Sequence, residues 1–118
     1  MNLREIKELL NAEVLVAEDA LDSIEVEKGY ASDLMSDVLA FSSPAVLLLT
    51  GLTNVQIFRT AQMLDIPSIV FVRGKMPSED LLKLAKEANM PILRTFMSMF
   101  ESCGRLYAKN LAPCSIKH

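Results

Sequence analysis

Residues 45–72 read AVLLLTGLTNVQIFRTAQMLDIPSIVFV. Two apolar runs, Ala45–Leu49 and Ser68–Val72, flank a segment whose apolar residues recur at helical spacing. An uninterrupted apolar run of this length is typical of a strand that is covered on both faces of a sheet. The segment between the runs predicts a helix that starts with a capping box, Thr53-x-x-Gln56, and ends at Ile66-Pro67. Residues 45–72 therefore predict a β-α-β unit.

The same pattern continues toward the C-terminus. Ser78 predicts the N-cap of a helix that runs to about Ala88, Met90–Leu93 predicts a third, shorter strand, and a last helix starts at Thr95 or Ser98 and runs to about Lys109. Strands that alternate with helices imply a parallel sheet with right-handed crossovers. We therefore expect an α/β fold, a three-layer α/β/α-like domain with a mainly parallel sheet of roughly four or five strands.

The first 44 residues are harder to interpret. Apolar spacing and capping residues predict a helix over 2–11 with a capping box of Asn2 and Glu5, a strand over 12–17, a short half-buried strand around Ile24 and Val26, a turn or bulge at Gly29, and a helix over 32–41 capped by Ser32.

Length and composition are those of one globular domain. The chain has 118 residues, of which 51% are hydrophobic and 23% charged, so it can build a core and is not of the disordered class. We expect one domain over 1–118, with an acidic part (1–44), the β-α units (45–109) and a tail (110–118). The mean hydropathy of +0.28 is high for so small a chain and suggests that surplus apolar residues form an oligomer interface.

Charge is unevenly distributed along the chain. Residues 1–40 hold ten acidic and three basic residues, a net of −7, whereas residues 41–118 hold nine basic and five acidic, a net of +4. This argues against nucleic acid as a partner and permits a local anion site in the second part. No apolar run is long enough to span a bilayer and residues 1–10 do not resemble a signal peptide, so we expect no membrane partner and a cytoplasmic location.

The residue types for common catalytic or metal chemistry are scarce. Cys103 and Cys114 are not at Cys-x-x-Cys spacing, so we expect two reduced thiols. The single histidine is the final residue, His118, which makes a His-dependent triad or a multi-histidine site improbable. Phosphate-loop, dinucleotide and nucleophile-elbow motifs are absent from the sequence. We expect a protein without catalytic residues, metal or cofactor.

Polar loops follow the three strands of the β-α units. In open α/β sheets, ligands bind beyond the carboxyl ends of the strands, where helix N-termini add positive potential. A small anion such as a phosphate or carboxylate group suits this edge, and ordinary loop chemistry is the alternative. Tyr30, Ser32 and Asp33 could approach the same edge. The candidate ligand-binding residues are Thr50, Gly51, Thr53, Asn54, Arg73, Gly74, Lys75, Arg94 and Thr95.

The last helix is apolar over more than one face. This width is more than a helix with a single core-facing stripe requires, and flexible methionines suit an adaptable interface. We therefore expect a homodimer through this helix, the alternative being a helix that is wedged in its own core. The interface candidates are Phe96, Met97, Met99, Phe100, Cys103, Leu106 and Tyr107.

Four phrases, in this order, resemble the DRTGG-domain family, which is similar to the N-terminal domain of HPr kinase/phosphorylase. They are Gly29–Leu39 (GYASDLMSDVL), Leu49-Thr50-Gly51, Val70–Lys75 (VFVRGK) and Ile92–Thr95 (ILRT). The resemblance covers roughly residues 1–110 and implies a regulatory-type α/β domain. Such domains occur beside CBS domains and in phosphotransacetylases, and small stand-alone members occur near iron-only hydrogenase genes. A literal Asp-Arg-Thr-Gly-Gly motif is absent from this chain.

Three hypotheses follow. The first is a non-catalytic regulatory module that binds a small anionic ligand, a nucleotide being one candidate, at the strand-end loops. The second, implied by the resemblance, is an accessory or assembly subunit that docks on a redox enzyme of the hydrogenase type through its apolar helix. The third is an enzyme of unknown reaction that uses Asp33 or Lys75, and it is the weakest because no paired acid and base are visible.

Overall fold

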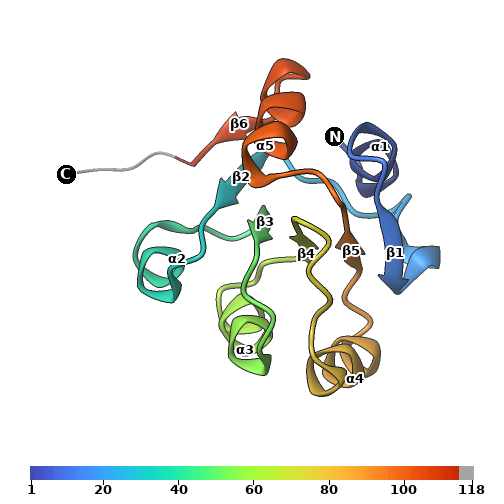
Figure 1. Cartoon of the computed structure of the whole chain (residues 1–118), viewed down its shortest axis with the longest axis vertical. Helices are drawn as coiled ribbons and strands as arrows, with labels where there is room; N and C mark the ends of the chain where they lie inside the picture. The colour runs from blue at the N-terminus through green and yellow to red at the C-terminus, as the bar shows by residue number, and fades with distance from the viewer. Residues whose placement is uncertain (115–118) are drawn as a thin grey trace.

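A six-stranded sheet forms the middle layer of the computed structural model, which describes residues 1–114. The strand order is β1-β5-β4-β3-β2-β6 (Figure 1). Neighbouring strands from β5 to β6 are parallel, whereas β1 lies antiparallel to β5 at one edge. The strands are β1 Glu13–Val16, β2 Lys28–Ala31, β3 Val46–Thr50, β4 Ser68–Phe71, β5 Ile92–Arg94 and β6 Ala112–Pro113.

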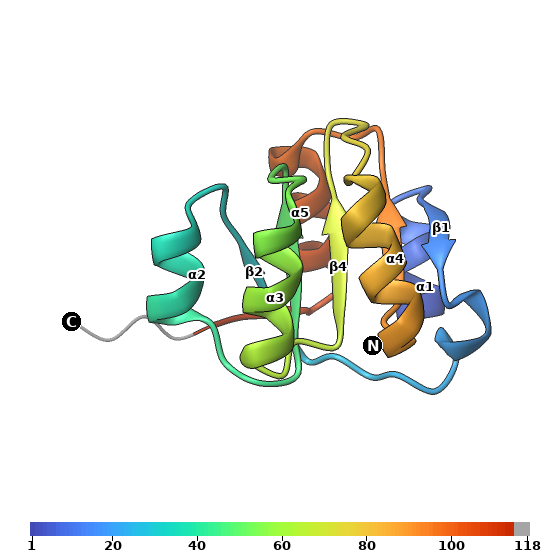
Figure 2. The ribbon, with the colours of Figure 1, turned by 90° about the horizontal axis from the view of Figure 1, so that it is seen from below.

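Helices cover both faces of this sheet. Helices α2, α3 and α4 lie on one face and α1 and α5 on the other (Figures 1 and 2). The α/β class, the mainly parallel sheet and the β-α units of residues 45–109 are therefore confirmed. The helices are α1 Leu3–Leu9, α2 Met35–Phe41, α3 Val55–Met63, α4 Glu79–Ala88 and α5 Met99–Ala108, with a 3-10 turn at Glu18–Ala20. Within the described residues, no helix has the length and apolar character needed to cross a bilayer.

The central strand β3 is buried on both faces, as its apolar run predicts. Leu47 and Leu49 pack toward α1 and α5, and Leu48 packs toward α2, α3 and α4. Each face of the sheet thus has its own apolar core, and β3 lies between the two.

The second strand differs from the one expected. Ile24 and Val26 do not form it: the Val26 side chain is buried in the core, and the segment pairs only with the N-terminus, where the Leu3 N–H donates to the Ile24 carbonyl at 3.1 Å. Strand β2 instead includes Gly29, for which we expected a turn or bulge. A Cβ on Gly29 would lie 3.0 Å from Leu111 Cδ2, so packing explains this glycine.

Two predicted helix starts are wrong by one or a few residues. Asn54, not Thr53, caps α3, and its Oδ1 accepts from the Ile57 N–H at 3.3 Å. Helix α2 begins at Met35 because the Ser32 hydroxyl accepts from the Leu34 N–H at 3.0 Å in a local turn instead of capping the helix.

The segment that we expected to be a tail contains β6, which pairs in parallel with β2 at Lys28↔Ala112. Its two residues extend the sheet by one strand beyond the four or five expected. The single histidine, His118, lies outside the described residues.

Candidate functional site

Three chain segments meet at the carboxyl edge of the sheet around one carboxylate. Asp33 follows β2, Gly51 follows β3 and Arg73 follows β4. Asp33 Oδ1 accepts from the Gly51 N–H at 2.6 Å and from the Thr50 hydroxyl at 3.4 Å. Asp33 Oδ2 accepts from Arg73 Nη2 at 3.1 Å. A backbone amide, a hydroxyl and a guanidinium therefore converge on the position of one anion.

Glycine at position 51 allows this approach. A Cβ there would lie 2.0 Å from Arg73 Nη2, so any side chain would displace the guanidinium. The backbone of Arg73 and Gly74 turns sharply, with φ of 58° and 66°, and their N–H groups donate to the Met97 and Thr95 carbonyls at 2.9 and 2.8 Å. These bonds tie the loop after β4 to the loop after β5.

The hydrogen bonds also control the charge of Asp33. Partial burial raises its pKa, but the bonds from Gly51, Arg73 and Thr50 outweigh that effect and hold the pKa below its ordinary value of 3.8. The Asp33 and Arg73 side chains are 41% and 42% exposed. We call Thr50, Gly51 and Arg73 the anion cradle. Arg73 opens to solvent, whereas Thr50 is fully buried, and the Asp33 carboxylate occupies the position between these donors.

Three further predicted ligand residues lie beside the cradle. Lys75 is exposed and makes no ion pair within residues 1–114. Asn54 caps α3, and the Thr53 carbonyl accepts from the Ser78 N–H at 2.9 Å, which joins the starts of α3 and α4. Of these three residues, only Lys75 carries a charged side chain.

Arg94 and Thr95 are engaged elsewhere. Arg94 forms an ion pair with Glu13 on β1 and lies 4.9 Å from the centroid of the Phe96 ring. Thr95 is fully buried, and its hydroxyl donates to the Leu10 carbonyl at 2.7 Å. The structure therefore does not present these two residues to a ligand at the cradle, and they link the sheet edge to its neighbours.

Asp33 is at the centre of the site, although the sequence indicates only that it could approach this edge of the sheet. An aspartate just beyond a predicted strand would have been the signal. Because the sequence pattern predicts this strand at Ile24 and Val26, it puts Asp33 at the start of the following helix and not at the end of β2.

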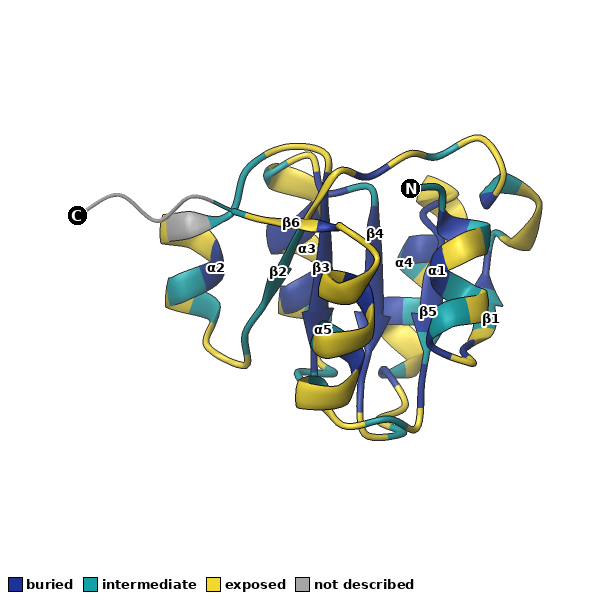
Figure 3. Ribbon diagram, turned by 90° about the horizontal axis from the view of Figure 1, so that it is seen from above, coloured by how far each residue is buried: buried dark blue, intermediate teal, exposed yellow. Residues whose placement is uncertain are grey.

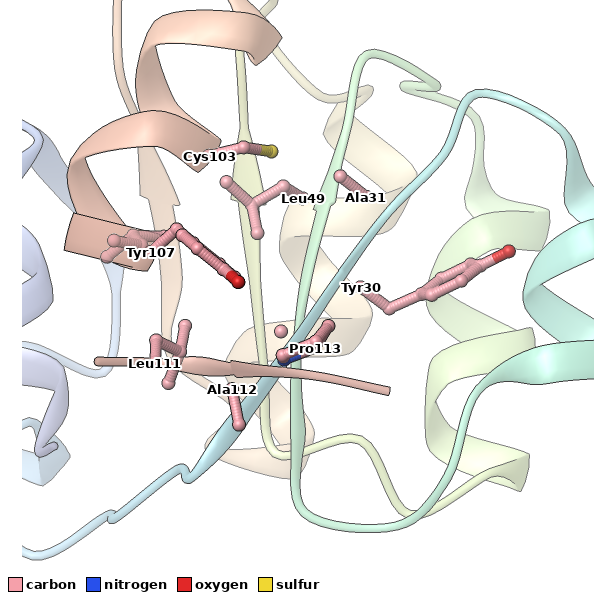
Figure 4. A pocket seen from close by; sticks show the side chains of 10 residues that line it. Tyr30, Ala31, Leu49, Cys103, Tyr107, Leu111, Ala112 and Pro113 are labelled. Carbon is pink, nitrogen blue, oxygen red and sulfur yellow. The ribbon is translucent and has the colours of Figure 1, made fainter. Parts of the chain in front are cut away.

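A second concave feature lies on the α1/α5 face, between α5 and strands β2 and β6. This apolar trough has a volume of about 190 Å³. Its walls and floor are Gly29, Tyr30, Ala31, Leu49, Cys103, Leu106, Tyr107, Leu111, Ala112 and Pro113 (Figure 4). It exists because β2 presents only the small Gly29 and Ala31 to this face, whereas the Tyr30 ring points away, into the core of the opposite face.

The predicted interface residues of the last helix divide into two groups. Leu106 is buried, and Met97, Met99 and Cys103 pack partly against the core, as a wedged helix would require. Phe96, Phe100 and Tyr107 are 72%, 90% and 69% exposed. The wedged-helix alternative therefore describes the first group, and the interface prediction is left with the three exposed aromatic residues.

Two of these residues have specific surroundings. Phe96 lies over Gly74, where a Cβ would come within 2.6 Å of the ring, so it belongs to the strand-end loops. Burial raises the pKa of the Cys103 thiol, which disfavours a reactive thiolate at the trough.

Comparisons with known proteins support the fold. No family model matches the chain, and no curated protein matches it. Among solved structures, the chain is similar to the crystal structure of the CBS and DRTGG domains of the regulatory region of Clostridium perfringens pyrophosphatase, complexed with the activator diadenosine tetraphosphate. The identity is 22% and the TM-score 0.72, over 94% of this chain and 47% of that one. The likeness confirms the α/β fold.

Proposed function

We propose that this chain is a non-catalytic regulatory module whose anion cradle binds a phosphate group of a small ligand, a nucleotide being the first candidate. The observation that carries the proposal is the convergence of the Gly51 N–H, the Thr50 hydroxyl and the Arg73 guanidinium on one anionic position. Backbone amides, hydroxyls and arginine are the groups that proteins use to hold phosphate oxygens. Lys75 adds a further positive charge nearby.

In the structure, the Asp33 carboxylate takes the place of that anion. A phosphate can enter only when the β2–α2 loop that carries Asp33 moves away, which makes binding and loop position interdependent. Such a coupling suits regulation better than turnover, because Asp33 is already engaged as an acceptor and is paired with a cation, not with a proton-transfer partner. The similar pyrophosphatase region is regulatory and was solved with a nucleotide activator, which is consistent with this proposal.

Titration with inorganic pyrophosphate, ATP and diadenosine tetraphosphate tests the proposal, by calorimetry and by the shift in melting temperature. Arg73→Ala removes a charge-assisted hydrogen bond worth about 1.5–3 kcal/mol, so we expect affinity to fall at least tenfold. Asp33→Ala removes the internal competitor, and we expect affinity to rise about three- to tenfold. Lys83→Ala, which removes an exposed lysine on α4 away from the cradle, is the matched control.

Circular dichroism should show that each variant is folded. The proposal fails if none of the three probes binds the wild type, or if Arg73→Ala binds as tightly as Lys83→Ala. If Asp33→Ala binds more weakly than the wild type, Asp33 supports the cradle and does not compete with the ligand.

A cytoplasmic location and a redox-enzyme partner remain proposals that follow from the sequence. The exposed aromatic residues of α5 are the surface on which such a partner would dock. The homodimer is also a proposal, and the structure offers a specific surface for it.

A further inference from the structure

We propose that a second copy of this chain covers the apolar trough, with helix α5 of each copy crossing α5 of the other antiparallel and Phe100 of each copy entering the trough of the other. This inference goes beyond the anion cradle and does not depend on it. It rests on the shape of the trough, on the residues exposed beside it and on the charge pattern along α5.

The two faces of the sheet are covered unequally. Within residues 1–114, three helices lie on one face and two on the other, and α5 and α1 leave the face of β2 free of any helix (Figures 1 and 3). The trough of about 190 Å³ occupies this uncovered part. Its side chains are almost wholly hydrocarbon, so an apolar side chain is a better occupant than a nucleotide, whose polar groups would find few partners there.

The same face also carries an exposed aromatic side chain, Phe100, of the kind that could fill the trough of a second copy. Phe100 is 90% exposed and Tyr107, which forms part of the trough wall, is 69% exposed. On a helix, positions 100 and 107 lie two turns apart on one side, with Gly104 between them. A trough and an exposed aromatic ring on one surface are what a two-fold symmetric interface requires, because each copy must supply both.

Gly104 permits close approach of a second helix. In the described part of the chain, a Cβ at this position would meet no atom within 4 Å. Glycine in a solvent-exposed helix interior is less favourable than alanine. A second helix backbone crossing here would use the space that the missing side chain leaves. With the two-fold axis between positions 103 and 104, Phe100 lies opposite the partner's Tyr107.

The charges on α5 fit the antiparallel direction. Glu101 lies near its N-terminal end, and Arg105 and Lys109 lie toward its C-terminal end. In the single chain, Glu101 and Arg105 pair with each other at 3.2 Å on the exposed surface of the helix, on the side of α1. In an antiparallel pair, Glu101 of each copy comes within one turn of the partner's Arg105. In a parallel two-fold pair, Glu101 and Arg105 of one copy would lie on the opposite side of the contact from those of the other copy, so no such pair would form.

Sedimentation velocity tests the proposal. At about 0.5 mM, a dimer with a Kd of ~0.1 mM is mostly associated, so we expect the wild type to sediment as a dimer. Phe100→Asp places a charge in the partner's trough and should give a monomer. Met63→Asp is the matched control, because Met63 is 66% exposed on α3 at the opposite face, and it should remain dimeric.

Charge swapping tests the direction of the helices. Glu101→Arg alone and Arg105→Glu alone should each sediment as monomers. An equimolar mixture should form a heterodimer, because each copy then presents only one sign of charge to the other. In a Cys103→Ser/Cys114→Ser background, Gly104→Cys should form an intermolecular disulfide upon oxidation, whereas Met63→Cys should not.

A wild type that is monomeric at this concentration overturns the proposal and leaves the trough to a different protein or to a small apolar ligand. A dimer that Phe100→Asp does not dissociate also overturns it, because another surface then forms the contact. A dimer that dissociates in Phe100→Asp, with no heterodimer from the charge variants, retains the surface and rejects the antiparallel arrangement. Loss of phosphate binding in Arg73→Ala leaves all of these outcomes unchanged, so the two proposals fail separately.

Discussion

Asp33 links three strand ends through hydrogen bonds to Gly51, Thr50 and Arg73. These bonds favour its charged form and lower its pKa, so its contribution to stability depends on pH in a defined direction. Because the folded pKa lies below the unfolded value, the contribution is complete above pH 3.8. It is lost as the pH falls through the folded pKa.

The Asp33→Asn variant tests this dependence. Since the ion pair is partly exposed and screened by solvent, we expect the wild type to be more stable by only about 1 kcal/mol at neutral pH. The difference should shrink between neutral pH and about pH 2.5, because the wild-type carboxyl becomes protonated as the pH falls through its folded pKa. Urea unfolding of both proteins at the two pH values measures it. A difference that is the same at both values would show that the charge of Asp33 does not contribute.

The helices that border the site owe their start points to single side chains. Asn54, Ser78 and Ser98 each accept a hydrogen bond from the third residue of the helix that follows. Ser78 and Ser98 act as the sequence predicts. Glu101, three residues after Ser98, does not complete a capping box, because its carboxylate pairs with Arg105. At α3 the sequence pattern predicts the adjacent Thr53 instead of Asn54, because threonine followed by glutamine three residues later satisfies the local pattern as well as asparagine does.

Substitution at these two positions separates the cap from its neighbour. Asn54→Ala should lower the free energy of unfolding by about 1 kcal/mol, because the Ile57 N–H loses its acceptor. Thr53→Ala should change it by less than about 0.5 kcal/mol, since the bond from Ser78 is made to the Thr53 backbone carbonyl. Chemical denaturation of the two variants provides the comparison. Equal losses would contradict the assignment of Asn54 as the cap.

Side-chain burial is most complete in the central strands of the sheet and, among the α-helices, least complete in α2, beside β2. Strands β3 and β4 are buried along their full length. Helix α2 has seven residues, no side-chain cap, and only Val38 among its described side chains fully buried. Because α2 follows the loop that carries Asp33, the part of the fold that must move for an anion to enter is also the part with the least packing.

Hydrogen exchange monitors this difference along the chain. Amides of Leu47–Leu49 and Ile69–Phe71 should open only with global unfolding and exchange slowest. Amides of α2 should exchange through local opening, and Asp33→Ala should accelerate them further while leaving β3 unchanged. Protection of α2 equal to that of β3 would indicate that the β2–α2 loop does not move independently.

Local patterns in the sequence were sufficient for the β-α units. Apolar runs identify β3 and β4, and helical spacing with caps identifies α4 and α5, because burial and capping depend on neighbours a few residues away. The parallel arrangement of these strands is enough to predict that the loops after them lie at the same edge of the sheet. The part of the site that these patterns predicted is Thr50, Gly51, Arg73 and Lys75.

Contacts between distant segments could not be read in this way. Arg73 meets Asp33 from 40 residues away, and Thr95 donates to Leu10 from 85 residues away. Position 29 in strand β2 is a glycine because Leu111, more than 80 residues away in the sequence, leaves little room for a side chain there. The antiparallel β1, the position of β2 and the pairing of β6 all depend on strand order. Strand order follows from packing the complete chain into one sheet, and neither residue spacing nor local propensity encodes it.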